Sequence, residues 1–120
     1  MSYSNPTTAC YTVRTAAVDT GATMDTIKGP SGMKGRVVDV SYVVAVEVTG
    51  TASVITVGLS GDTDAYVSSL SIPAGIVGVA GNGATMVADH EIPADTIVLV
   101  TSSGAATAGD ADLFVIIDWY

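Results

Sequence analysis

The stretch that decides the fold runs from Gly35 to Gly50 and reads GRVVDVSYVVAVEVTG. Its even-numbered positions are apolar: Val38, Val40, Tyr42, Val44, Val46 and Val48. The odd-numbered positions from Asp39 to Thr49 are mostly small or polar. A two-residue period places the two sets on opposite faces of a β-strand, and the β-branched content disfavours a helix. Because a strand of about thirteen residues is long, we expect a bend or bulge midway. The stretch therefore predicts a central strand of an antiparallel sandwich, with the even-numbered side chains facing the core.

The remaining sequence predicts shorter strands separated by turns. The expected strands are 9–18, 23–28, 53–60, 66–72, 85–90, 96–101 and 111–119. We expect a turn at 29–32, a hairpin closed at 50–51, a turn at 61–64, a Gly/Ala-rich segment at 74–84 and a small-residue loop at 102–110. The strand at 96–101 is nearly continuously apolar, which predicts burial on both of its faces. Together these patterns predict an all-β, antiparallel β-sandwich, jelly-roll-like, with about eight strands. One domain would span 9–120, after an extended N-terminal arm at 1–8.

The charge distribution is uneven. The net charge is −8, and the four basic residues, Arg14, Lys28, Lys34 and Arg36, all precede residue 37. An acidic chain without a cationic cluster argues against binding to nucleic acid or to an anionic membrane. The mean hydropathy of +0.51 is high for so short a chain, so we expect a homo-oligomer, and specifically a trimer. We also expect a soluble protein, because the sequence shows no apolar run of about 18 residues and no signal peptide, and the single cysteine is consistent with synthesis in the cytoplasm.

Candidate chemistry is sparse, and we expect no enzyme, cofactor or metal. His90 is the single histidine, and on a strand its neighbours Asp89 and Glu91 would point to the opposite face. Asp62 and Asp64 are typical of a turn, and a calcium loop would need more carboxylates at fixed spacing. The single cysteine, Cys10, excludes an internal disulfide, and we expect it to be a small residue packed on a strand. Carboxylates that meet from different strands remain open as a hydrolase site.

Two stretches resemble a known family. Residues 27–40 read IKGPSGMKGRVVDV, and residues 92–99 read IPADTIVL, followed by AGDAD at 108–112. They resemble the Gly-Pro-x-Gly-x-x-Gly-Arg-Val-x-Asp-Val stretch and the later turn-plus-strand pattern of small structural proteins of tailed phages. The resemblance covers residues 27–120, and residues 1–26 match nothing in it. It implies a capsid decoration (cement) protein, which is a β-sandwich module, often trimeric, bound outside the major capsid shell, and it carries no catalytic motif.

We therefore expect a structural virion protein on the capsid exterior, with the major capsid protein as its partner. Its expected contact is made by the basic N-terminal section, through Arg14, Lys28, Lys34 and Arg36. The alternative is a head-fibre or tail-associated module that binds host carbohydrate through Tyr66, Trp119 or Tyr120. A flat apolar face with a basic rim would favour capsid binding, and basic or aromatic residues gathered on a concave face would favour sugar binding.

Overall fold

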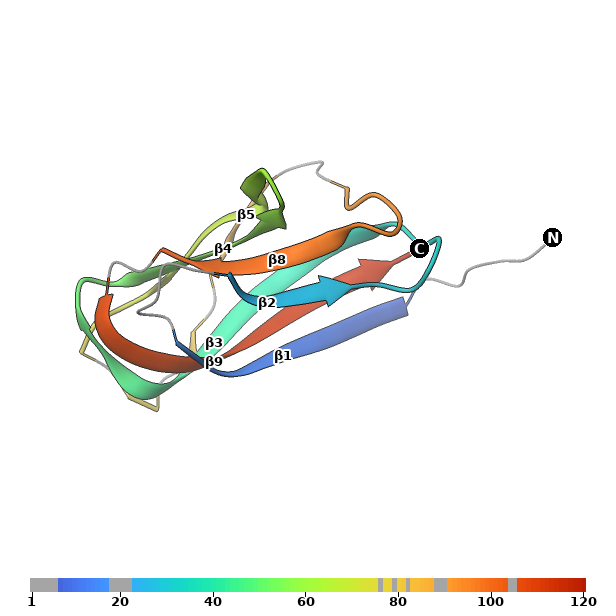
Figure 1. The fold of residues 1–120 in the computed structure, drawn as a ribbon. Helices are drawn as coiled ribbons and strands as arrows, with labels where there is room; N and C mark the ends of the chain where they lie inside the picture. The colour runs from blue at the N-terminus through green and yellow to red at the C-terminus, as the bar shows by residue number, and fades with distance from the viewer. Residues whose placement is uncertain are drawn as a thin grey trace.

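The computed structural model describes residues 7–17, 23–75, 77–78, 80–81, 83–87, 91–103 and 106–120. These residues form nine strands: β1 (Thr7–Ala17), β2 (Thr23–Lys28), β3 (Gly35–Gly50), β4 (Ser53–Leu59), β5 (Asp62–Ile72), β6 (Ala80–Gly81), β7 (Thr85–Met86), β8 (Ile97–Ser102) and β9 (Ala106–Trp119). One sheet has the order β1-β9-β3-β6, and the other has the order β2-β8-β4-β5-β7. The two sheets pack face to face as a sandwich (Figure 1). The described part of the chain contains no helix long and apolar enough to cross a membrane.

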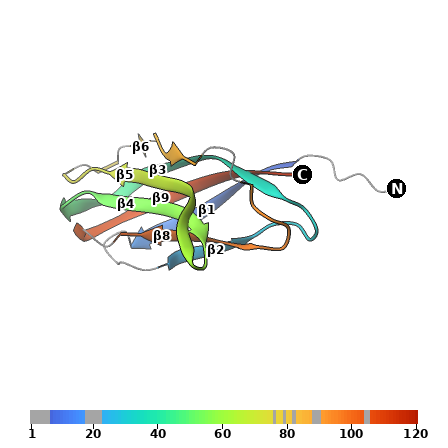
Figure 2. The ribbon, with the colours of Figure 1, turned by 90° about the horizontal axis from the view of Figure 1, so that it is seen from above.

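The pairing of the strands is nested. β1 pairs with β9, β2 with β8, β3 with β6 and β4 with β5, and each pair is antiparallel. A long antiparallel ribbon rolled up on itself gives this order, which is that of a jelly roll. Seen from above, the longer strands of both sheets run along one common axis (Figure 2). The predicted sandwich is thus confirmed. It has nine strands in place of about eight, and two of them, β6 and β7, are only two residues long.

The inward face of β3 follows the predicted period in its middle and departs from it at both ends. Val40, Tyr42, Val44 and Val48 are buried. Val38 and Val46, however, are 47% and 51% exposed, so their predicted burial is wrong. The register against β9 shifts between Val37 and Asp39 and again between Val44 and Val46. Each irregularity turns the next apolar side chain outward, which confirms the expected bulge in so long a strand.

The last strand carries much of the core. Its buried side chains are Ala111, Leu113, Val115, Ile117 and Trp119. β9 begins at Ala106, inside the segment predicted as a loop at 102–110, because the small residues there pair with the end of β3. In β8, Val98 and Val100 are fully buried while Ile97 is 50% exposed. Only one face of this strand is therefore buried, and the prediction of burial on both faces is wrong.

The structure differs from the prediction at two turns and at the start of the first strand. The turn at Gly50, with a φ of 82°, carries the chain from the four-stranded to the five-stranded sheet, so no hairpin joins β3 and β4. β5 begins at Asp62, which shortens the turn before it. β1 begins at Thr7, so residues 7 and 8 of the predicted arm belong to this strand. Residues 1–6 of that arm and residues 88–90 of the strand predicted at 85–90 lie outside the described part.

Candidate functional site

Three of the four predicted contact residues lie at one end of the sandwich. Lys28 is the last residue of β2, Lys34 lies in the turn before β3, and Arg36 is the second residue of β3. All three side chains are exposed. Tyr120 lies at the same end, since its backbone exchanges hydrogen bonds of 2.8 and 2.9 Å with the backbone of Lys34. We define the turn end as residues 28–36, 91–95 and 118–120.

Arg14 lies elsewhere. Across the four-stranded sheet, Arg36 is level with Asp118 and Asp118 is level with Thr8. Arg14 follows Thr8 by six residues along β1, which is about 20 Å at 3.3 Å per residue. The four predicted cations therefore do not form a single cluster.

The turn end is built around Trp119. This side chain is 1% exposed, and its ring lies directly against Gly29 and Gly35. A Cβ atom at Gly29 would lie 2.4 Å from the indole ring, and one at Gly35 would lie 2.5 Å from it. Such distances exclude any side chain at either position without a shift of the ring. The glycines at position 29, directly after β2, and at position 35, the first residue of β3, are therefore explained by the bulk of Trp119.

Two segments that are far apart in the sequence meet at this end. Gly35 and Ile92 exchange backbone hydrogen bonds of 3.0 and 2.7 Å. The Gly32 amide donates to Oδ1 of Asp95 at 3.1 Å, across 63 residues of sequence. Asp95 has a φ of 60°, a left-handed conformation that aspartate tolerates better than most residues. Residues 29–35 and 91–95 therefore form one continuous piece of surface.

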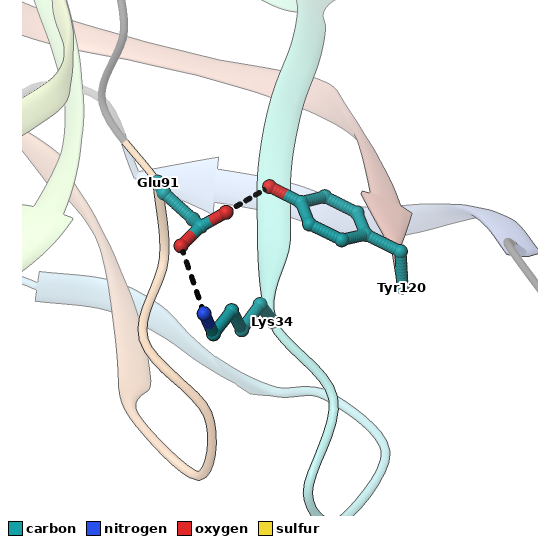
Figure 3. A network of polar contacts seen from close by, with 3 residues as sticks. All are labelled: Lys34, Glu91 and Tyr120. Atoms are coloured by element: carbon teal, nitrogen blue, oxygen red, sulfur yellow. Dashed lines mark hydrogen bonds and ion pairs between the residues drawn. The ribbon is translucent and has the colours of Figure 1, made fainter. Parts of the chain in front are cut away.

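Glu91 connects this surface to the end of the chain (Figure 3). Its carboxylate accepts a short hydrogen bond from the Tyr120 hydroxyl and lies 3.6 Å from Nζ of Lys34. The hydrogen bond from Tyr120, together with the positive charge of Lys34, lowers the pKa of Glu91 below its ordinary value. The same hydrogen bond raises the pKa of Tyr120. The network thus favours a negatively charged Glu91 and a neutral Tyr120 near neutral pH.

The side chains of the turn end are electrically neutral in sum. Its three positive charges, on Lys28, Lys34 and Arg36, are equal in number to its three negative charges, on Glu91, Asp95 and Asp118. The net charge of −8 therefore belongs to the rest of the chain. The expected basic end is thus a neutral end on an acidic body, because the fold adds carboxylates from distant parts of the sequence to the N-terminal cations.

A hollow of about 480 Å³ opens at the turn end, where Arg36, Asp118 and Tyr120 line it together with Thr8 of β1. The Thr8 hydroxyl donates to Oδ1 of Asp118 at 2.5 Å. Of the three aromatic residues considered for sugar binding, Tyr66 and Trp119 are buried and Tyr120 is 38% exposed. This hollow is the place where the structure offers an exposed ring together with polar side chains.

The outer surface of the four-stranded sheet carries apolar residues among polar ones, since Thr12 and Ser41 lie level with Phe114. Phe114 and Ile116 of β9 and Val43 of β3 are half-buried there, and Cys10 of β1 lies level with Ile116. We call these four residues the apolar face. Cys10 is exposed and free, so the expectation that it packs on a strand is wrong. A second hollow, of about 290 Å³, lies beside Phe114 and is lined by Ser41, Tyr42, Val43, Ala80 and Gly81.

The structure describes only some of the remaining candidates for chemistry. Asp62 and Asp64 lie at the start of β5, and His90 and Asp89 lie outside the described residues. Within the described ranges, no group of three or more His, Cys, Asp or Glu side chains is placed to hold a metal ion.

Sequence reasoning missed two parts of these surfaces. In the strand predicted at 111–119, Phe114 and Ile116 alternate with Leu113, Val115 and Ile117, so two large apolar residues on the face opposite the core were a usable signal of the apolar face. The contact of Glu91 with Tyr120 joins residues 29 positions apart. No local pattern could have indicated it.

Comparison with known proteins gives limited information. Neither a protein family nor a curated protein matches the chain significantly. Among solved structures, a chain of the cyanophage Pam1 capsid asymmetric unit is 21% identical, over 97% of this chain and 84% of that chain, with a TM-score of 0.49. A likeness of this size carries no argument about function.

Proposed function

We propose that this protein is a structural virion protein, namely a decoration (cement) protein that binds the outside of the major capsid shell of a tailed phage. The observation that carries the proposal concerns the two stretches that resemble the phage family. Residues 27–40 and 92–99 are distant in the sequence, yet they contact each other at the turn end through Gly35–Ile92 and Gly32–Asp95. A pattern shared by two segments that build one surface supports a shared role for that surface.

The turn end is the proposed contact with the shell. The rest of the chain carries the whole net charge of −8, so it repels any acidic surface. The neutral end, with Lys28, Lys34 and Arg36 exposed, can approach such a surface with the least repulsion. Arg14 takes no part in this contact, because it lies about 20 Å away along β1.

The size of this end supports an oligomer. The two shorter dimensions of the molecule are 27 and 21 Å, which gives an end-on footprint of roughly 570 Å². A standard interface covers about 800 Å² on each partner, so one copy would bind weakly. An oligomer, which we propose to be the trimer expected from the hydropathy, would place several ends on one shell and add their binding energies. Binding to the assembled shell alone would then stabilise that shell by mass action.

In this account the protein acts by binding, without catalysis. The second candidate is the carbohydrate-binding virion module, and the hollow lined by Thr8, Arg36, Asp118 and Tyr120 favours it. An exposed tyrosine beside hydroxyl, guanidinium and carboxylate groups can stack on and hydrogen-bond to a sugar.

Co-sedimentation with capsids of the same phage that lack their decoration protein tests the proposal. The purified chain should pellet with intact shells at saturable stoichiometry. A chain that stays in the supernatant and binds host polysaccharide instead would favour the second candidate.

A further inference from the structure

Each sheet of the sandwich has two outer strands, and the unpaired side of an outer strand can accept a further strand. Three of these four strands are poorly suited to it. β6 and β7 have two residues each, and β2 carries Asp25 and Lys28 and has an irregular register after Thr23. β1, by contrast, has eleven residues at the border of its sheet (Figure 1), and its register with β9 is regular from Thr7 to Val13. These residues of β1 include no charge, proline or glycine, so this edge lacks the usual protection against strand addition.

Half of the β1 backbone groups point away from the sheet. Lys34 and Tyr120 exchange backbone hydrogen bonds, so the N–H and C=O groups of Tyr120 face β3. Because these groups alternate in direction along a strand, those of Trp119 face β1, where its register partner is Thr7. Every second residue of β1 from Thr7 onward therefore bonds to β9, and within the described ranges the residues between them have no other backbone partner. The three residues with outward backbone groups are Thr8, Cys10 and Thr12.

The side chains at this edge indicate what kind of strand fits. On the inner side, Ala9 and Tyr11 of β1 and Met24 of β2 pack against the core but are only partly buried. On the outer side, Thr8 and Thr12 are exposed and polar. Since successive side chains of a strand point to opposite faces, an added strand would cover the inner apolar residues with every second side chain. A segment in which apolar and polar residues alternate therefore fits the edge.

The position of the edge indicates which molecule supplies the segment. The edge begins at the turn end, where Thr8 lines the hollow together with Arg36 and Asp118. The end-on footprint of roughly 570 Å² is smaller than the about 800 Å² of a standard interface. A segment of the shell that follows β1 from Thr7 to Val13 would lengthen this contact by about 20 Å. A second copy fits less well, because pairing along the strands would bring two bodies of net charge −8 side by side.

We propose that the free edge of β1 takes an extended segment of the major capsid protein as an additional strand. Its backbone bonds to the outward groups of β1, and its apolar side chains cover Ala9 and Tyr11. The identity of the partner rests on the proposed function, whereas the free edge is a property of the fold. On the capsid, β1 becomes an inner strand and the four-stranded sheet gains a fifth strand.

Co-sedimentation with undecorated capsids tests the proposal by two substitutions at one position. Cys10→Pro removes an outward N–H, and proline is tolerated on an edge strand where the N–H faces solvent. Cys10→Ala removes the same thiol and keeps the N–H. Cys10→Pro should raise the dissociation constant for capsids at least about tenfold relative to Cys10→Ala, because a backbone bond is lost and the ring occupies the place of the added strand. Equal binding by the two variants would overturn the proposal.

Hydrogen exchange, followed by mass spectrometry at single-residue resolution, gives a readout that needs no substitution. In the free protein, the amides of Cys10 and Thr12 should exchange rapidly, and those of Ala9 and Tyr11, which bond to β9, should exchange slowly. Binding to capsids should slow exchange at Cys10 and Thr12 at least about tenfold. Unchanged exchange at both residues in the bound protein would overturn the proposal. This measurement decides the question even if Cys10→Pro fails to fold, which circular dichroism would reveal.

The two proposals can fail separately. A parent chain that does not pellet with capsids would contradict the proposed function and strand addition together. A parent and a Cys10→Pro variant that pellet equally well would leave the proposed function intact and refute strand addition alone. If ultracentrifugation without capsids shows that the parent associates and Cys10→Pro does not, a second copy occupies the edge, and the proposal is refuted.

Discussion

The indole N–H of Trp119 donates a hydrogen bond of 2.8 Å to the hydroxyl of Tyr11. The two rings meet edge to face, with centroids 6.5 Å apart. Tyr11 belongs to β1 and Trp119 to β9, so the bond links the first and last strands of the chain. It also fixes the ring against which Gly29 and Gly35 pack. The order of the turn end therefore depends on a residue that does not belong to it.

Replacing Tyr11 by Phe should destabilise the fold. The substitution leaves the buried Trp119 N–H without its acceptor, and an unsatisfied buried donor costs about 1–3 kcal/mol. Denaturant unfolding followed by tryptophan fluorescence measures this cost. Tyr120→Phe is the control, because it removes an exposed hydroxyl and should change the free energy of unfolding by less than about 0.5 kcal/mol. Equal stability of the Tyr11→Phe variant and the parent would contradict the role given to this bond.

Adding a methyl group beside Trp119 should also destabilise the protein. The Cβ of Gly35→Ala would lie 2.5 Å from the indole ring, and overpacking of this kind typically costs about 1–3 kcal/mol. The melting temperature should fall for Gly35→Ala and for Gly29→Ala. Ser31→Ala, an exposed position in the same turn, should leave it unchanged. A Gly35→Ala variant that melts with the parent would show that the indole ring can move away without cost.

The two faces of β3 can be distinguished by one substitution made at two positions. Val44→Asp places an unpaired charge in the core, where Val44 is 1% exposed. The cost should be several kcal/mol, comparable with the whole stability of a small domain. Val46→Asp, two residues further along, should be tolerated because Val46 is 51% exposed. Circular dichroism of both variants checks this, and a folded Val44→Asp protein would mean that the assigned inward face is wrong.

The Glu91 network should make the stability of the folded protein weakly dependent on pH. The pKa of Glu91 is lowered in the folded state, so its contribution to stability is present above the pKa of the unfolded chain. This contribution is lost as the pH falls through the lower folded value. The melting temperature of the parent should thus fall more steeply between neutral pH and pH 3 than that of Glu91→Gln, by a small margin because the groups are exposed. Parallel curves for the two proteins would show that the network does not contribute.

Sequence reasoning could predict the fold because strand periodicity is local. It identified the inward positions from Val40 to Val44. It could not place Val38 or Val46, because a bulge depends on how two strands fit together. It also treated the turn at Gly50 as a hairpin, since the same turn residues serve a connection between two sheets. For the site, closeness in sequence grouped Lys28, Lys34 and Arg36 correctly, whereas Glu91, Asp95 and Asp118 come to the turn end only through tertiary contacts.

The central claim is that the turn end binds the shell. Its most direct test is co-sedimentation of the protein with undecorated capsids, using two variants with the same change in charge. Lys28→Gln/Lys34→Gln lowers the charge by two at the turn end. Thr26→Asp/Ser71→Asp lowers it by two at exposed positions on the outer surface of the five-stranded sheet. Arg14→Gln serves as a further comparison, because Arg14 lies outside the proposed contact.

The account predicts that the lysine variant loses capsid occupancy, and that its deficit is largest at low salt, where electrostatic attraction is least screened. The Thr26→Asp/Ser71→Asp and Arg14→Gln proteins should decorate capsids like the parent. Full occupancy by the lysine variant, at a salt concentration where the aspartate variant fails to bind, would contradict the claim and place the contact on the side of the sandwich.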